Sequence, residues 1–249
     1  MIFRKAFQMD YLNNIKYFMP QKSFWKIVGA VIVAIGIPFF FIGHGGSMIG
    51  CVTIAVGLCV FIFAKDARPS DADIDNAVAK KIQNVDEFAR RGIDVREKLI
   101  KAFPPVMFSD FDYNAGSDDE DELKVQRGQD RKYRSNKYAA AQIMFATEKL
   151  HIFMYRFCLT KEADDEKYFE AKYTDLQDAV IEKDSRKFNI PKGKGFEEVE
   201  LEYRAIVIRG NDGEIIFKMP VHDGADVDKA VDTINRLISS KKAELEKSN

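Results

Sequence analysis

Charged side chains are absent from one long stretch of this chain, although 31% of its 249 residues are charged. The 38 residues from Ile27 to Ala64 include no Asp, Glu, Lys or Arg. A helix of about 20 apolar residues is long enough to cross the hydrocarbon layer of a bilayer. The run therefore argues against a purely soluble globular protein and predicts a membrane segment.

Other shortages exclude several classes of protein. Three Cys are too few for a disulfide scaffold, and 20 Phe and 9 Tyr are too many for a disordered chain. The formal net charge is -1, and no domain-sized segment has a large excess of Lys and Arg. We therefore expect no nucleic-acid partner.

Catalytic and metal-binding patterns are also missing. The three His lie far apart in the sequence, and no Cys-x-x-Cys, His-x-x-x-His or Gly-x-Ser-x-Gly occurs. Lys192-Gly193-Lys194-Gly195 lacks the pattern of a phosphate-binding loop. The sequence predicts no catalytic residue, no metal site and no cofactor, and we expect the protein not to be an enzyme.

The uncharged run is about twice as long as one membrane span and breaks at Gly43-His44-Gly45-Gly46-Ser47. It predicts a transmembrane helical hairpin over residues 24–64, which would make the lipid bilayer a partner. Lys and Arg flank both outer ends but not the turn, which predicts that both termini are cytoplasmic in a multi-pass protein of the cell membrane. Residues 1–23 fit either an interfacial helix or a simple polar lead-in.

Small residues recur at a spacing of seven within the two expected helices. Gly29 and Gly36 on the first helix could pack against Gly50 and Gly57 on the second, because glycine lets two helix backbones approach closely. The alternative is that glycine is simply common in apolar helices. No Asp, Glu, Lys or Arg lies between Ile27 and Ala64, which favours an anchor over a transporter.

Residues 65–104 predict a helical connector. Ser70 can cap a helix that begins with Asp71, and Ile74, Val78 and Ile82 follow at helical spacing. This apolar stripe requires a partner, which could be the following domain or another copy of the chain.

After Pro105 the hydrophobic period changes from helical to about two residues, which predicts strands. The expected strands are 106–113, 138–146, 150–159, 167–173, 177–183, 198–208 and 214–218. Asn211-Asp212-Gly213 predicts a tight hairpin turn between the last two. A final helix should carry the stripe Val227, Val231, Ile234 and Ile238, followed by a polar tail at 243–249.

This order of elements resembles the pleckstrin-homology (PH-like, GRAM-like) domain of bacterial proteins. The run from Gln142 to Phe153 is similar to one of its hairpins, Tyr173 to Val180 is similar to the start of its fifth strand, and Pro220 to Ile238 is similar to its ending. The resemblance implies an α+β chain in which residues 105–242 form a seven-stranded antiparallel β-barrel closed by the C-terminal helix.

The first long loop of the expected barrel is highly charged. An acidic run, Asp118 to Glu122, precedes a group of basic residues, Lys124, Arg127, Arg131, Lys132, Arg134 and Lys137. Resemblance to phosphoinositide-binding PH domains implies that these cations could bind an anionic lipid surface. The alternative is a solvated, flexible loop.

Together these features favour a membrane-anchored, non-enzymatic adaptor that presents a PH-like module at the cytoplasmic face and binds a protein partner. The alternative is a structural subunit of a larger membrane complex, and an unrecognised enzyme is a third hypothesis. An adaptor should show a concave or apolar surface on the module. A subunit should instead expose the apolar stripe of residues 70–103.

Overall fold

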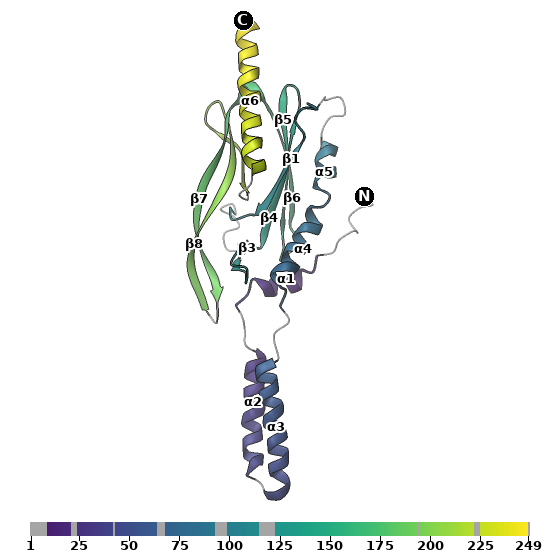
Figure 1. The fold of residues 1–249 in the computed structure, drawn as a ribbon, viewed down its shortest axis with the longest axis vertical. Coiled ribbons are helices and arrows are strands. Elements are labelled where there is room, and N and C mark those ends of the chain that lie inside the picture. Colours follow the sequence, from purple (N-terminus) through teal and green to yellow (C-terminus); the bar gives the residue numbers. More distant parts are fainter. Residues whose placement is uncertain are drawn as a thin grey trace.

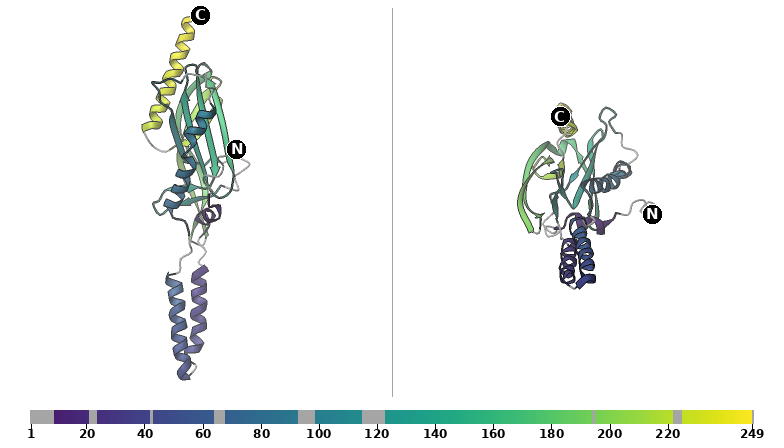
Figure 2. Two further views of the ribbon diagram at one scale, coloured as in Figure 1. Left: turned by 90° about the vertical axis from the view of Figure 1, so that its right-hand side faces the viewer. Right: turned by 60° about the horizontal axis from the view of Figure 1, so that its bottom comes forward.

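The computed structural model describes residues 9–20, 24–41, 43–63, 68–92, 99–114, 123–193, 195–221 and 225–248. It has a body of strands and helices, from which a two-helix hairpin extends at one end (Figures 1 and 2). The C-terminal helix projects from the opposite end (Figure 1). The chain is α+β, as the sequence predicts.

Two antiparallel sheets form the body. The first has the order β1-β4-β5-β6, from β1 (Val106–Phe111), β4 (Lys137–Phe145), β5 (Lys149–Cys158) and β6 (Asp164–Lys172). The second has the order β7-β8-β9, from β7 (Leu176–Lys192), β8 (Gly195–Gly210) and β9 (Ile215–Val221). A 3-10 turn, η2 (Tyr173–Asp175), joins them, and the small hairpin β2 (Val125–Arg127) and β3 (Tyr133–Ser135) is inserted after β1.

One hydrophobic core lies between the two sheets and the helix α6 (Ala225–Ser248). Ile234 is completely buried in this core beside Val227, Ala230 and Ile238, which confirms the predicted stripe. Asn235 fixes the helix on β7, because its side-chain amide exchanges two hydrogen bonds of 2.8 Å with the backbone of Ala179. The helix continues to Ser248, through most of the segment predicted as a polar tail, and a Lys241–Glu244 ion pair supports its last turns.

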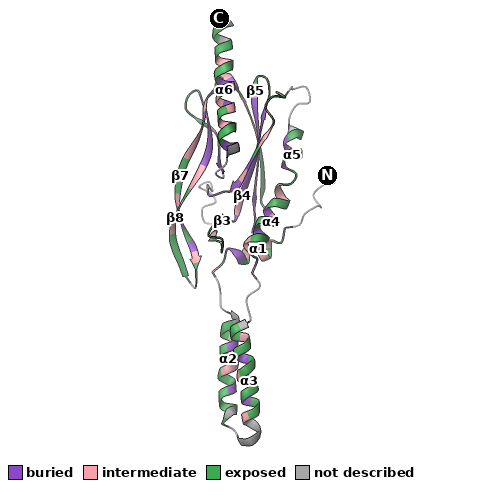
Figure 3. Ribbon diagram, viewed as in Figure 1, coloured by how far each residue is buried: buried purple, intermediate pink, exposed green. Residues whose placement is uncertain are grey.

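A second core covers the other face of the four-stranded sheet. It is formed by α1 (Tyr11–Tyr17), α4 (Asp71–Ile82) and α5 (Val85–Gly92) against side chains of β4 and β5. Ile74 and Val85 are completely buried there, and the inward faces of the helices are purple in Figure 3. The apolar stripe of the connector therefore finds its partner in the following domain. Ser70 and Asp73 form the expected cap of α4.

The predicted single barrel is wrong. In the part of the chain that the structure describes, nine strands form sheets of four, two and three strands, and none of these sheets closes into a barrel. Within the described residues, no strand ladder joins β9 to β1 or β6 to β7. β7 and β8 have 17 and 16 residues, against six in β1, so the second sheet extends well past the edge that it would have to meet.

The hairpin consists of α2 (Phe24–Phe40) and α3 (Gly43–Phe63), which lie side by side (Figures 1 and 2). Gly29 lies against Gly57, and Gly36 lies against Gly50 and Ile54. A Cβ at Gly29 would come within 2.6 Å of the Phe61 backbone nitrogen, so the helices could not approach this closely with a larger residue. The structure thus brings together the four glycines that the spacing singled out.

The predicted pair of membrane spans is contradicted. Among the helical residues that the structure describes, no helix has both the length and the apolar character needed to cross a membrane. α2 has 17 residues, or about 25 Å, against a hydrocarbon layer of about 30 Å. α3 has 21 residues but begins with Gly-His-Gly-Gly-Ser, so its apolar part is shorter. The prediction of a two-span, multi-pass protein of the cell membrane is corrected accordingly.

Candidate binding cleft

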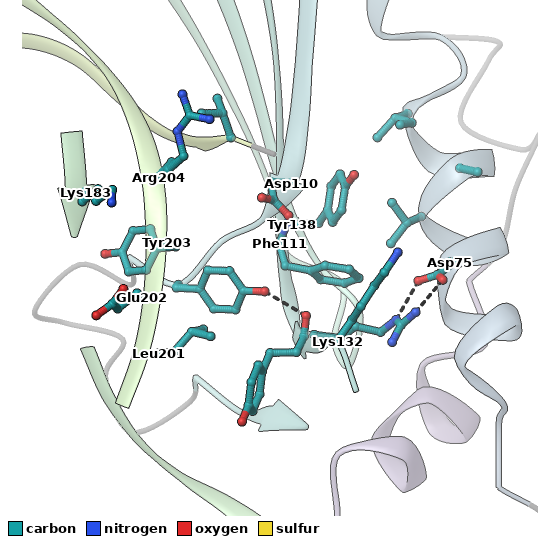
Figure 4. Close-up of a pocket in the computed structure, with 17 residues that line it drawn as sticks. Asp75, Asp110, Phe111, Lys132, Tyr138, Lys183, Leu201, Glu202, Tyr203 and Arg204 are labelled. Carbon is teal, nitrogen blue, oxygen red and sulfur yellow. Dashed lines mark hydrogen bonds and ion pairs between the residues drawn. The ribbon is translucent and has the colours of Figure 1, made fainter. Parts of the chain in front are cut away.

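A cleft with a volume of about 640 Å³ lies beside β1, the edge strand of the four-stranded sheet (Figure 4). One wall is formed by Leu201 to Arg204 of β8. The opposite wall is formed by α4, with the end of β1 and residues 132–134 of the β2–β3 hairpin between them. The cleft thus collects residues from segments that are more than 100 positions apart in the sequence.

Five aromatic rings line the cleft. The rings of Tyr113 and Tyr203 lie 5.5 Å apart between centroids, which brings the end of β1 against β8. Phe111 meets Tyr138 edge-to-face at 5.1 Å. The Tyr113 hydroxyl donates a hydrogen bond of 2.9 Å to the Tyr133 carbonyl, drawn as a dashed line in Figure 4. These contacts fix the rings before any ligand arrives, which lowers the entropy lost on binding.

The hydroxyl groups of these rings are donors at neutral pH. Burial raises the pKa of Tyr138 to about 12. Burial likewise raises the pKa values of Tyr113 and Tyr203 above the ordinary value. Tyr138 donates to Ser109 Oγ at 3.1 Å, so its hydroxyl is held in place as well.

Two lysines reach the cleft from different sides. Lys132 belongs to the β2–β3 hairpin near α4, and Lys183 belongs to β7 behind the β8 wall (Figure 4). Acidic groups are also present. Asp110 is buried, and its Oδ1 accepts a hydrogen bond from the Phe111 N–H. Of the 17 residues that line the cleft, five are aromatic and seven are charged, with both signs present.

Arg134 holds the α4 wall to the β2–β3 hairpin. Its side chain is only 3% exposed. The guanidinium forms two hydrogen bonds of 2.7 Å with the Asp75 carboxylate on α4 and two of 2.9 and 3.0 Å with Asp130 in the turn. Paired hydrogen bonds between arginine and carboxylate are the strong class of such contacts. The hydrogen bond from Arg134 is the largest cause that lowers the pKa of Asp130 to about 2.

Asp71, at the start of α4, receives further bonds from the same turn. Its Oδ2 accepts the backbone N–H groups of Gln129 and Asp130 at 2.7 and 3.3 Å. A Cβ on Gly128 would come within 2.5–2.7 Å of the side-chain ends of Arg134, Asp130 and Asp71, so a larger residue would displace these groups. The turn is therefore anchored by backbone donors as well as by Arg134.

Asp71 also connects the cleft wall to the segments beside the helical hairpin. Its Oδ1 accepts a 2.7 Å hydrogen bond from the Tyr17 hydroxyl of α1. Arg68 lies over the Tyr17 ring and donates to the carbonyls of Tyr17 and Met19. Residues that precede α2 and follow α3 in the chain are thus joined next to the wall.

The six predicted lipid-binding cations do not form one surface. Arg134 is buried in the clamp, and the Arg127 guanidinium lies over the Tyr133 ring. Lys124 and Arg131 are exposed, Lys132 lines the cleft and Lys137 is half-buried at the start of β4. The acidic run lies outside the described residues. Anionic-lipid binding by these residues stays a prediction.

No pattern in the sequence marks the aromatic residues of the cleft as functional. Tyr113 ends an expected strand and Tyr203 lies inside another, where alternating aromatic residues are usual. Their meeting depends on how the two sheets pack.

Among the described residues, no group of three or more His, Cys, Asp or Glu is arranged to hold a metal ion. Comparison of the chain with known proteins finds no matching family model, no similar curated protein and no similar solved structure.

Proposed function

We propose that this chain is a non-enzymatic adaptor that binds a segment of a partner protein in the cleft beside β1. The observation that carries this proposal is the cleft itself, whose rings come from both sides and are held by one another. Tyrosine is enriched at protein interfaces, because it offers a large rigid contact area with a polar tip. The volume of about 640 Å³ is that of a small-molecule pocket, for which roughly 300–1,000 Å³ is usual, so the cleft has room for side chains of a partner segment.

The order of the elements supports the further proposal that residues 105–242 are related to PH-like domains. A four-stranded meander, a three-stranded meander and a C-terminal helix follow one another, with the helix packed between the sheets. The chain differs from the expected pattern in its open edges and in the inserted β2–β3 hairpin. The open edge at β1 is where the cleft lies.

Blocking the cleft tests the adaptor function. Ala79 is an exposed residue of α4 that lines the cleft, so Ala79→Trp would fill it without disturbing a core. Ala72 is exposed on the same helix and does not line the cleft, so Ala72→Trp is the matched control. The tagged full chain and both variants would be purified from cells, and the bound proteins quantified by mass spectrometry.

We expect at least one protein to copurify with the native chain and with Ala72→Trp, and to be lost with Ala79→Trp. Retention of every bound protein by Ala79→Trp would contradict a binding role for the cleft. Equal thermal unfolding of the two variants would confirm that the comparison concerns binding and not folding.

A structural subunit of a larger complex is a second candidate, because the α2–α3 hairpin exposes large apolar side chains. Twelve of them on the two helices, and Phe41 directly after α2, are between 41% and 79% exposed. Monomeric soluble proteins rarely expose apolar patches above roughly 300–600 Å². If this candidate holds, replacing residues 24–63 by a short polar linker should reduce the number of protein chains in the native particle. An unchanged number of chains would oppose it.

A further inference from the structure

One edge of β8 is open over half of the strand. β8 pairs with β7 from Gly195 to Gly210, but β9 pairs only with residues 204–209 of β8, because β9 ends at Val221, opposite Arg204. Among the described residues, no strand and no backbone hydrogen bond occupies the side of residues 196–203 that faces away from β7. The N–H and C=O groups on that side are therefore available to another strand.

This open edge begins inside the cleft. Val221 and residues 201–204 of β8 line the cleft together, and Figure 4 shows Leu201, Glu202 and Tyr203 along the strand that borders it. A segment that enters the cleft can therefore continue along β8 in line with β9, toward the far end of the β7–β8 ribbon (Figure 1). At about 3.4 Å per residue, residues 196–203 offer an edge of about 27 Å.

The other sheet edges differ from this one. On the outer side of β7, Asn235 of α6 bonds the Ala179 backbone, and β2 also lies against this strand. β6 carries charges of both signs, with a Lys167–Asp165 ion pair on the strand itself. β1 borders the same cleft but has only six residues. The open edge of β8 is longer than β1 and carries charge of one sign.

Residues 195–203 of β8 include four Glu and no Lys or Arg. Glu198, Glu200 and Glu202 are exposed, whereas the apolar residues at 199, 201 and 203 pack on the second core. The lysine that pairs with Glu198 at 3.1 Å, Lys187, lies on β7. A strand added on the open side would supply the neighbours on the side where β7 does not lie.

The sign of these charges limits what can bind at the edge. Cross-strand neighbours of opposite charge stabilise a sheet, and like charges opposite one another destabilise it. Pairing of two copies of the chain through this edge would place Glu against Glu. A basic segment is favoured instead, with Lys or Arg at every second position beside the three exposed glutamates.

We propose that the partner segment binds as an added strand on residues 196–203 of β8, with basic side chains alternating with apolar ones. This inference rests on the proposed adaptor function and names the kind of segment that the adaptor binds. Inside the cleft, where Lys132 and Lys183 lie, the segment presents apolar side chains to the aromatic rings. In strand addition, main-chain hydrogen bonds give affinity and alternate side chains give specificity.

A synthetic probe tests the main-chain bonds. The probe is a labelled octapeptide of alternating Val and Lys with blocked ends, and fluorescence anisotropy measures its binding to the full chain. Successive N–H groups of a strand point to opposite edges, so N-methylation of only the Val or only the Lys residues blocks one edge at a time. At least one of these two forms should bind roughly tenfold more weakly than the unmodified probe. Equal binding of all three, or no binding at about 1 mM probe, would overturn the proposal.

Glu200→Lys tests the charge, because Glu200 lies on the open edge and does not line the cleft. This change should weaken binding of the Val-Lys probe roughly fivefold and strengthen binding of a Val-Glu octapeptide. Glu166→Lys is the matched control, because Glu166 is an exposed strand residue of the other sheet and the change in net charge is the same. Equal effects of the two variants would show that the probe responds only to net charge, which would oppose the proposal.

The copurification experiment separates this inference from the function of the cleft. We expect Glu200→Lys to lose the same protein as Ala79→Trp. A protein that is lost with Ala79→Trp but retained with Glu200→Lys would leave the cleft function standing and exclude the added strand. Loss with Glu200→Lys alone would support the added strand and contradict the cleft function. A native particle of two chains that Glu200→Lys alters would mean that a second copy occupies the edge, and would overturn the proposal.

Discussion

Arg134 provides the sharpest test of the site, because sequence and structure assign it different roles. The sequence groups it with exposed cations that could bind an anionic surface. In the structure it is buried and clamps Asp75 and Asp130 with four hydrogen bonds of 2.7–3.0 Å. Arg134→Gln should therefore reduce folding stability, whereas the loss of a lipid ligand would leave stability unchanged.

The size of the stability loss depends on how exposed the two carboxylates bound by Arg134 are. Breaking a fully buried ion pair costs about 3–5 kcal/mol, because it leaves an uncompensated charge. Here the Asp75 and Asp130 side chains are 50% and 37% exposed, so water can solvate both carboxylates once the arginine is removed. We therefore expect Arg134→Gln to lower the free energy of unfolding by about 2 kcal/mol, between the values for surface and buried pairs.

Urea unfolding of the full chain, followed by circular dichroism, measures this difference. Arg131→Gln is the matched control, because Arg131 is exposed in the same hairpin and the same charge is removed. We expect it to change the free energy of unfolding by less than about 0.5 kcal/mol. Arg134→Lys should recover only part of the stability, because an ammonium cannot bind two carboxylates in the paired geometry. Equal stability of Arg134→Gln and Arg131→Gln would refute the clamp.

Three other outcomes rest on burial. Ile234→Ala should lower the free energy of unfolding by about 2–5 kcal/mol and the melting temperature with it. Arg236 is exposed on the same helix, so Arg236→Ala should hardly change the melting temperature. Identical melting curves for the two variants would mean that α6 is not docked on the core. A fragment of residues 68–248 should unfold cooperatively. A fragment of residues 105–242 should not, because it lacks the helices that cover the second core. Cooperative melting of the shorter fragment would contradict this expectation. Burial raises the pKa values of at least six of the nine Tyr. The protonated Tyr side chains therefore stabilise the folded state below about pH 10, the pKa in the unfolded chain. This stabilisation is lost as the pH rises toward the raised pKa values of the folded chain. Phenolate absorbance should therefore develop at higher pH in the folded chain than in guanidinium, and coincident titrations would exclude the effect.

Local patterns predicted the individual elements well. The Asn211-Asp212-Gly213 turn joins β8 to β9, with Gly213 at a φ of 82° that glycine adopts without strain. The cap at Ser70 forms as the sequence predicts. These features depend on residues a few positions apart, so the sequence contains all the information that they need.

The same local patterns could not predict which distant strands pair with one another. Whether a sheet closes depends on the meeting of edge strands such as β1 and β9, which lie about 100 residues apart. β2 and β3 have three residues each, too few for a visible alternation. They are fixed by Asp71 and Asp75, more than 50 residues earlier, so neither interpretation of the charged loop, lipid binding or a solvated loop, included its attachment to α4. The absence of Asp, Glu, Lys and Arg from residues 27–64 indicated apolar helices. It did not show how long each helix is.

The position of the cleft follows from the way the four-stranded sheet is covered. Both faces of this sheet are buried, one by the second sheet and α6 and the other by α1, α4 and α5. Its β1 edge lines the cleft between these two layers, and the β2–β3 hairpin is bound to α4 there through Arg134 and Asp71. The α4 wall of the cavity is held to the β2–β3 hairpin by ion pairs and backbone hydrogen bonds, and the β8 wall is held by the contact of Tyr203 with Tyr113. The clamp is therefore a condition for the cleft, and weakening it should affect binding and stability together, whereas filling the cleft at Ala79 should affect binding alone.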